Sequence, residues 1–183
     1  MLVDPNLREV IAGPRGMLPG IQACLDQQCL VSAVTLVFAA IDALAALTRP
    51  INQPETDGAT FRTWATRFLH PVQRMNCTVE DLWGARCGVL HTYSPEAERA
   101  ARRGARRIYY QWRLGPTADT VRVLPARSVV VIIEDLYAAL LDGAHAYMAE
   151  ASANADLKAR LNAHLSSLLC YEPSDPFVAA MDA

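Results

Sequence analysis

Lysine is almost absent from this chain of 183 residues. Lys158 is the single lysine among 17 basic residues. Arginine-rich, alanine-rich and lysine-poor chains are what GC-rich coding produces, so the arginines alone do not indicate a nucleic-acid-binding protein. The formal net charge of −2 excludes a polycation that binds nucleic acid over its whole surface. Any surface that binds RNA is therefore local.

Cysteine is sparse and unpatterned. The five cysteines are odd in number, and no two of them form a C-x-x-C pair or stand beside a histidine cluster. This pattern argues against a disulfide framework and against a zinc site. We therefore expect reduced thiols, a cytoplasmic location, and no metal or other cofactor.

The chain also lacks a long uninterrupted apolar run. Its first residues have neither the basic nor the apolar region of a secretory signal peptide. The longest apolar stretch, Leu30 to Leu47, is interrupted by Ser32, Thr35 and Asp42. A membrane span needs about 20 predominantly apolar residues. We therefore favour a central helix of a bundle or dimer, and we expect no membrane association.

The hydrophobic fraction of 52% is sufficient for a substantial core. Because no repeat or low-complexity linker is present, we expect one domain over residues 1–183 with a loosely held tail at about 171–183. Apolar periodicity and Pro or cap signals predict an all-α helical bundle. The expected helices are a short one within residues 1–18, then about 19–47, one ending at His70-Pro71, Thr78 to about Thr92, one from Ser94, about 127–150 and 153–169.

Two segments between the helices favour β structure. Ile108–Trp112 is aromatic and β-branched, and Val121–Leu124 alternates between apolar and polar residues. Gly115-Pro116 lies between them and predicts a turn. We therefore expect a short β-hairpin around residues 106–124, inserted into the helical bundle.

The segment from Arg86 to Tyr93 places a permanent cation, an acid/base group and a phenol within two helical turns. On a helix of 3.6 residues per turn, Arg86 and Tyr93 share an apolar stripe, whereas His91 shares a strip with Gly84 and Gly88. Arg86 and His91 are separated by about 140° around the axis, so they converge only at the border of the two strips. Because the glycines allow a second helix to approach closely, the pattern favours a site at a subunit interface.

These residue types suit phosphodiester cleavage. A histidine transfers protons near neutral pH, and a planar guanidinium binds phosphate well. No carboxylate cluster suited to Mg²⁺ stands nearby, which favours a metal-free mechanism. Asp42 lies in an apolar stretch and needs a partner if buried, so we expect it to pair with Arg86 or to orient His91; a surface aspartate is the alternative.

A basic segment follows the motif. Eight arginines against one acid lie between Arg99 and Arg127, and three aromatic residues are interleaved with them. Arginines with interleaved aromatics suit single-stranded RNA, and the alternative is a solvated helix face beside core aromatics. The candidate RNA-binding residues are Arg102, Arg103, Arg106 and Arg107.

The pattern Arg86-x4-His91-x-Tyr93 resembles the signature of HEPN domains, particularly the toxins of HEPN/nucleotidyltransferase toxin–antitoxin pairs. The resemblance implies a helical, dimeric, metal-independent endoribonuclease with two copies of the motif facing a cleft. Arg86 would stabilise the charge of the phosphorane-like transition state, and His91 would act as general acid/base. Tyr93 would be the position that a partner nucleotidyltransferase adenylylates to silence the toxin.

One position departs from the family pattern. HEPN proteins usually carry Asn, Asp or His directly after the motif arginine, and this chain carries Cys87 there. We expect Cys87 and Asp42 to contact the catalytic residues without reacting themselves. The alternative that Cys87 favours is a catalytically inactive, HEPN-like dimeric binding or scaffold protein. A helical interaction protein in which the motif arose by chance is a third interpretation.

Overall fold

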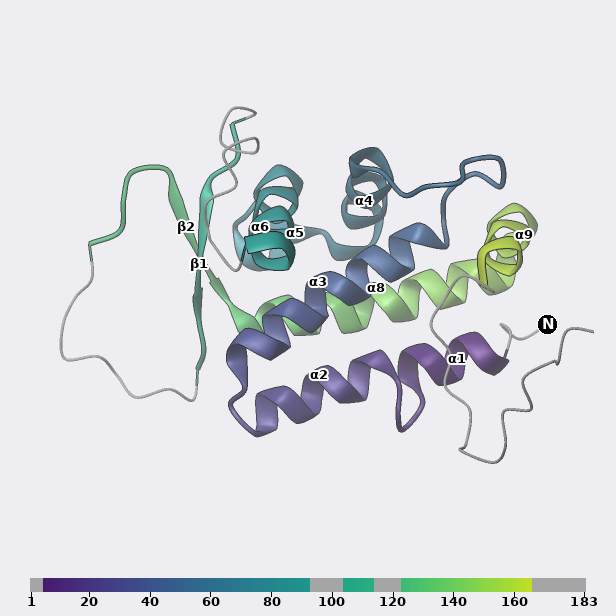
Figure 1. Ribbon diagram of the computed structural model, residues 1–183, viewed down its shortest axis with the longest axis horizontal. Coiled ribbons are helices and arrows are strands. Elements are labelled where there is room, and N and C mark those ends of the chain that lie inside the picture. Colours follow the sequence, from purple (N-terminus) through teal and green to yellow (C-terminus); the bar gives the residue numbers. More distant parts are fainter. Residues whose placement is uncertain (1–4, 93–103, 114–122, 166–183) are drawn as a thin grey trace, which may run out of the picture.

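The structure, a computed structural model, describes residues 5–92, 104–113 and 123–165, and it is mostly helical (Figure 1). The helices are α1 (Pro5–Ala12), α2 (Met17–Asp26), α3 (Leu30–Ala46), α4 (Gly58–Trp64), the π-helix η1 (Ala65–Leu69), α5 (Pro71–Met75), α6 (Val79–Thr92), α8 (Ile133–Ala153) and α9 (Ala155–His164). The strands are β1 (Arg107–Gln111) and β2 (Ser128–Ile132). The expected tail at 171–183 and the helix expected from Ser94 lie outside the described residues.

Helix α3 is the centre of the bundle, as its apolar sequence predicts. It contacts α2, α4, α6 and α8, and its buried side chains include Val37, Phe38 and Ile41. In Figure 1, α1 and α2 lie on one side of α3 and α8, the α4–α6 segment lies on the other, and the two strands stand at one end. Buried apolar residues from α1 to α9 belong to one core cluster. No helix in the described part of the chain is both long and apolar enough to cross a membrane.

The single helix expected over about 19–47 is in fact two helices. Helix α2 ends at Asp26, Gln28 has a left-handed φ of 55°, and α3 begins at Leu30. The polar run Asp26-Gln27-Gln28 carries the turn, and the two helices then pack against each other. A straight helix of this length would extend about 43 Å, whereas the hairpin buries Leu18 and Ile21 in the same core as α3.

The amphipathic helix expected to end at His70-Pro71 is confirmed, although its last turn is a π-helix. Its predicted apolar face, Phe61 to Leu69, is buried, and His70 ends it with a left-handed φ of 46°. Gly143 of α8 allows η1 to approach closely, because a Cβ there would lie 2.9 Å from the carbonyl oxygen of Phe68. The absence of a side chain at Gly143 thus fixes the spacing between η1 and α8.

The predicted β-hairpin is wrong. Strand β1 pairs in parallel with β2, with Arg107 opposite Ser128 and Gln111 opposite Ile132. A parallel pair needs a connection of a dozen or more residues, and residues 112–127 supply it. The second strand is formed by the β-branched run that we assigned to the start of the next helix. Val129 and Val131 alternate as buried residues in β2, and α8 begins only at Ile133, with Glu134 and Asp135 in its first turn.

Candidate functional site

The N-terminus of α6, the helix that carries Arg86 and His91, is fixed by a reciprocal cap. Thr78 Oγ1 accepts a hydrogen bond from the Asp81 amide at 3.1 Å, and the Thr78 amide donates to Asp81 Oδ2 at 2.8 Å. Glu80 and Asp81 lie in the first turn, where the helix dipole favours anions. The predicted cap at Thr78 is therefore confirmed, and it sets where every later residue of α6 lies around the helix.

Arg86 pairs with Asp42, which confirms the partner expected for this carboxylate. Arg86 Nε donates to Asp42 Oδ2 at 2.7 Å, and Arg86 Nη2 donates to the same oxygen. Both side chains are only about one-fifth exposed, at 21% and 22%. Burial alone would lower the pKa of Arg86, but the hydrogen bond and charge of Asp42, with a smaller contribution from Cys87, raise it above its usual value. The pair joins α6 to the central helix α3.

The Trp83 ring also contacts the guanidinium of Arg86. The Arg86 guanidinium carbon lies 5.3 Å from the Trp83 ring centroid, and that of Arg62 lies 4.9 Å from the same ring. Arg62 in turn makes an ion pair with Glu80, with Nε 2.5 Å from Oε1. Cation–π contacts of this kind stabilise and orient the arginine. Arg86 is therefore positioned by a cluster that draws on α3, α4 and α6.

The other residues of the motif surround Arg86 in the sequence, and several of them belong to α6. Gly84 and Gly88 are buried, and Cys87 is half-buried. His91 belongs to α6, about 7.5 Å along the helix axis from Arg86, and its side chain lies outside what the structure describes. Tyr93, Arg102 and Arg103 also lie outside the described residues. Arg86 and His91 therefore lie five residues apart on one helix.

Arg106 binds a buried carboxylate. Its amide donates to Asp81 Oδ1 at 2.5 Å, its Nη2 lies 2.8 Å from Asp81 Oδ2, and Nη2 also donates to the Asn76 carbonyl at 3.0 Å. Burial raises the pKa of Asp81, but the hydrogen bonds from Arg106 and Thr78 outweigh it and lower that pKa overall. These contacts account for the position of the Arg106 side chain without a bound RNA. That Arg106 or Arg107 contacts RNA stays a prediction; Arg107 donates to the Tyr109 hydroxyl at 3.2 Å.

The candidate metal ligands and cysteines give no further site in this region. Across residues 5–92, 104–113 and 123–165, no three His, Cys, Asp or Glu side chains gather as metal ligands would. The cysteines described there, Cys24, Cys29, Cys77 and Cys87, are free thiols. Burial raises the pKa of the Cys77 thiol to about 12, which keeps it protonated and unreactive at neutral pH.

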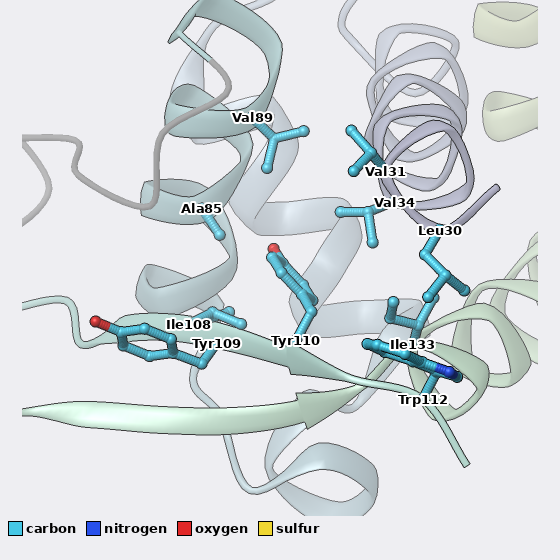
Figure 2. Close-up of a pocket in the computed structure, with 10 residues that line it drawn as sticks. All are labelled: Leu30, Val31, Val34, Ala85, Val89, Ile108, Tyr109, Tyr110, Trp112 and Ile133. Atoms are coloured by element: carbon cyan, nitrogen blue, oxygen red, sulfur yellow. The ribbon is translucent and has the colours of Figure 1, made fainter. Parts of the chain in front are cut away.

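Sequence reasoning missed an apolar pocket of about 390 Å³ between α3, α6 and β1 (Figure 2). Its lining residues are Leu30, Val31, Val34, Ala85, Val89, Ile108, Tyr109, Tyr110, Trp112 and Ile133. The aromatic and β-branched character of β1 was visible in the sequence. That this strand faces α3 and α6 was not, because it follows from the tertiary packing.

Comparisons of the chain with protein-family models, with curated proteins and with solved structures find no match. The interpretation of the site therefore depends on the motif and on the contacts described above.

Proposed function

We propose that this protein is a metal-independent endoribonuclease of HEPN type, and that α6 carries its catalytic residues Arg86 and His91. The observation that carries the proposal is the fixed guanidinium of Arg86, held by Asp42 and Trp83 five residues before a histidine on the same helix. An arginine held in one orientation loses little entropy when it binds a phosphate. Asp42 accepts from Arg86 Nε and Nη2, and it therefore fixes the plane of the guanidinium.

In the proposed reaction, the ribose 2′-oxygen forms a bond to phosphorus, and the bond from phosphorus to the 5′-oxygen breaks. His91 takes the proton of the 2′-hydroxyl or gives a proton to the leaving 5′-oxygen, and water takes or supplies the other proton. Arg86 stabilises the negative charge that develops on the phosphoryl oxygens. The products are a 2′,3′-cyclic phosphate and a 5′-hydroxyl, and neither oxidant nor cofactor is needed.

The same proposal assigns roles to residues around the site. Asp42 is a positioning residue that acts through Arg86. Arg102, Arg103, Arg106 and Arg107 belong to the segment proposed to bind the RNA strand. We propose a homodimer in which two α6 helices face one cleft, as the resemblance to HEPN domains implies; Gly84 and Gly88 are already buried within one chain, so the strip that they form is not the reason for it. Tyr93 is the proposed site of modification by a nucleotidyltransferase antitoxin.

The test is incubation of the purified chain with single-stranded RNA in EDTA, beside His91→Ala and Arg86→Ala. We expect cleavage by the wild type, a loss of about 10²-fold or more in each variant, and cyclic phosphate ends. The matched control is Arg74→Ala, because Arg74 also pairs with an acid, Asp142, but is half-exposed on α5. This variant should cleave as the wild type does.

One further substrate and one further variant sharpen the test. An oligonucleotide with a single 2′-deoxy sugar should resist cleavage at that position, because the nucleophile is missing there. Asp42→Asn should lower kcat more than it raises KM, since its proposed effect is to orient Arg86 toward the transition state. Cleavage that survives both His91→Ala and Arg86→Ala would eliminate this site.

A second candidate function is a HEPN-like dimeric scaffold without catalysis. The observation that favours it is the partly buried Arg86–Asp42 pair, which also serves to hold α6 against α3. Cys87, which replaces the usual polar residue after the arginine, favours it too. A wild-type chain that forms a dimer in sedimentation equilibrium but cleaves no RNA would support this function over the nuclease.

A further inference from the structure

The two-stranded sheet leaves the outer edge of β2 open. Strand β2 pairs with β1 on one side, and its other packing contacts are chiefly with α8, which continues it. In Figure 1 the two strands stand at one end of the bundle, and no other strand of the described residues lies beside β2. A two-stranded sheet is only marginally stable by itself, and natural proteins usually pair or protect such an edge. The edge of β2 is therefore a candidate surface for the addition of a strand.

The parallel register shows which backbone groups of β2 point away from β1. The Arg107 amide donates to the Arg127 carbonyl at 3.0 Å, so Arg127 directs its carbonyl toward β1. Because backbone groups alternate along a strand, those of Ser128, Val130 and Ile132 point outward. No hydrogen bond joins these outward groups to another strand or loop of the described residues. The Ile132 carbonyl begins α8 as its N-cap, so the three amides and the carbonyls of Ser128 and Val130 are available to a further strand.

The sequence of β2 lacks the usual protection of an open edge. Apart from Ser128, every residue of this strand is a β-branched apolar residue, and none is charged, proline or glycine. Natural edge strands commonly carry a charge or a proline, which discourages pairing with another chain. Strand β1, in contrast, begins with Arg107 and packs against α6. The edge of β2 is therefore the one suited to a further strand.

The charges at the two ends of β2 favour a second copy of the chain in antiparallel orientation. Arg127 is exposed just before the strand, and Glu134 and Asp135 follow it in the first turn of α8. Arg113 pairs with Asp135 and offsets one of these two acids, so that end stays negative. Antiparallel pairing about a twofold axis brings Arg127 of each chain toward the acidic end of the other, whereas parallel pairing would bring like charges together. The edge is thus complementary to itself.

We propose that two copies of this chain associate through their β2 edges and form one continuous sheet in the order β1-β2-β2-β1. Val130 lies opposite Val130 of the partner subunit, and the amide of each donates to the carbonyl of the other. The Ile132 amide of each chain donates to the Ser128 carbonyl of the other. The half-buried Val130 side chains meet on one face of the joined sheet.

This arrangement also places the α6 helices. A twofold axis normal to the sheet keeps the same face upward in both copies, and both α6 helices pack against β1, so they lie on one face of the joined sheet. Three strand spacings, about 14 Å, separate the two β1 strands. The inference rests on the open edge and not on the proposed nuclease, and it is compatible with the single cleft proposed for that activity.

The test measures self-association of the full chain by sedimentation equilibrium. Because a short edge buries little area, we expect a dimer with a dissociation constant of about 1–100 µM. Val130→Lys and Val130→Glu each place like charges opposite one another, and each should weaken the dimer about fivefold or more. An equal mixture of the two variants should associate to within about threefold of the wild type, since opposite charges then face each other.

The matched control is Ile51→Lys. Ile51 is also β-branched and is 60% exposed. It follows Pro50, whose carbonyl oxygen lies 3.3 Å from His164 Nε2 of α9, at the other end of the bundle from the strands (Figure 1). This variant should associate as the wild type does, because its new charge lies far from the β2 edge.

A proline variant tests the backbone hydrogen bonds. Proline is tolerated where the N–H of an edge strand faces solvent, so Val130→Pro should keep the β1–β2 ladder and a cooperative unfolding curve. It removes the Val130 amide from both copies and should weaken the dimer about tenfold or more. In the wild type, hydrogen exchange at the Val130 amide should slow as the chain concentration rises through the dissociation constant.

Three outcomes would overturn the proposal. They are a chain that stays monomeric at about 0.5 mM, well above the expected dissociation constant, a dimer that the charge at position 130 does not weaken, and a mixture of the two charged variants that associates no better than each alone. None of these measurements uses RNA, so a chain that dimerises through β2 but cleaves no RNA would refute the nuclease and leave this inference standing.

Discussion

The ion pair between Arg86 and Asp42 makes a quantitative prediction about stability. Replacing Asp42 with Asn keeps the size of the side chain but removes the charge that accepts from Arg86 Nε and Nη2. An exposed pair contributes about 0–1 kcal/mol, and breaking a fully buried pair costs about 3–5 kcal/mol. With both side chains about one-fifth exposed, at 21% and 22%, we expect a coupling energy of about 2 kcal/mol between these bounds.

The assay is a double-mutant cycle in urea at pH 7, with Asp42→Asn, Arg86→Met and the double variant. A coupling of about 2 kcal/mol corresponds to a midpoint difference of about 1 M urea for a slope of about 2 kcal/mol/M. The double variant should be more stable than the sum of the two single losses predicts. A coupling below about 0.5 kcal/mol would refute the reasoning, because it would place this pair among exposed ion pairs.

A matched pair serves as the control. Arg74 and Asp142 form an ion pair of 2.7 Å between α5 and α8, with both side chains about half exposed. Their coupling should fall within about 0–1 kcal/mol and should nearly vanish in 1 M salt, where the screening length is about 3 Å. The coupling between Arg86 and Asp42 should persist in the same salt, since partly buried pairs are screened less.

Three further predictions concern the bundle and the start of α6. Gly143→Ala should destabilise the chain by about 1–3 kcal/mol in urea unfolding, because the new Cβ meets the Phe68 carbonyl; an unchanged midpoint would mean that η1 shifts freely. Thr78→Ala should cost about 1 kcal/mol, while Thr78→Ser should recover most of that loss. The lowered pKa of Asp81 stabilises the fold above the unfolded value of 3.8, and this contribution is lost as pH falls through the folded pKa. The stability difference between wild type and Asp81→Asn should therefore be full at pH 6 and shrink below about pH 4; a difference independent of pH would contradict the Arg106 contact as its source.

Local signals predicted several helix boundaries but missed the turn between α2 and α3 and the start of α8. The helix end near residue 47, the stop at His70 and the cap at Thr78 are confirmed, because each depends on a residue and its immediate neighbours. The partner of Asp42 was also accessible from the sequence. A carboxylate inside an apolar helix must be paired, and Arg86 was one of the two groups expected to pair with it.

The β structure was mispredicted because strand pairing is not a local property. The run Val129–Ile133 has strong β propensity, yet whether it begins a helix or forms a strand depends on an available partner. That partner is β1, about 20 residues earlier, and its parallel orientation depends on a connection that no short turn signal marks. Gly115-Pro116 predicted a hairpin turn, whereas β1 and β2 pair in parallel.

The sequence by itself determined the helical class, the ends of several helices and the presence of Arg86 and His91 on one helix, because periodicity, caps and prolines act over a few residues. Only the tertiary structure decided that the Tyr110 hydroxyl is buried with no hydrogen-bond partner among the described residues, and that the pocket exists at all. Its lining comes from four elements between residues 30 and 133. Such a cavity is the space left where helices and a sheet of different shapes meet, and no local pattern encodes that space.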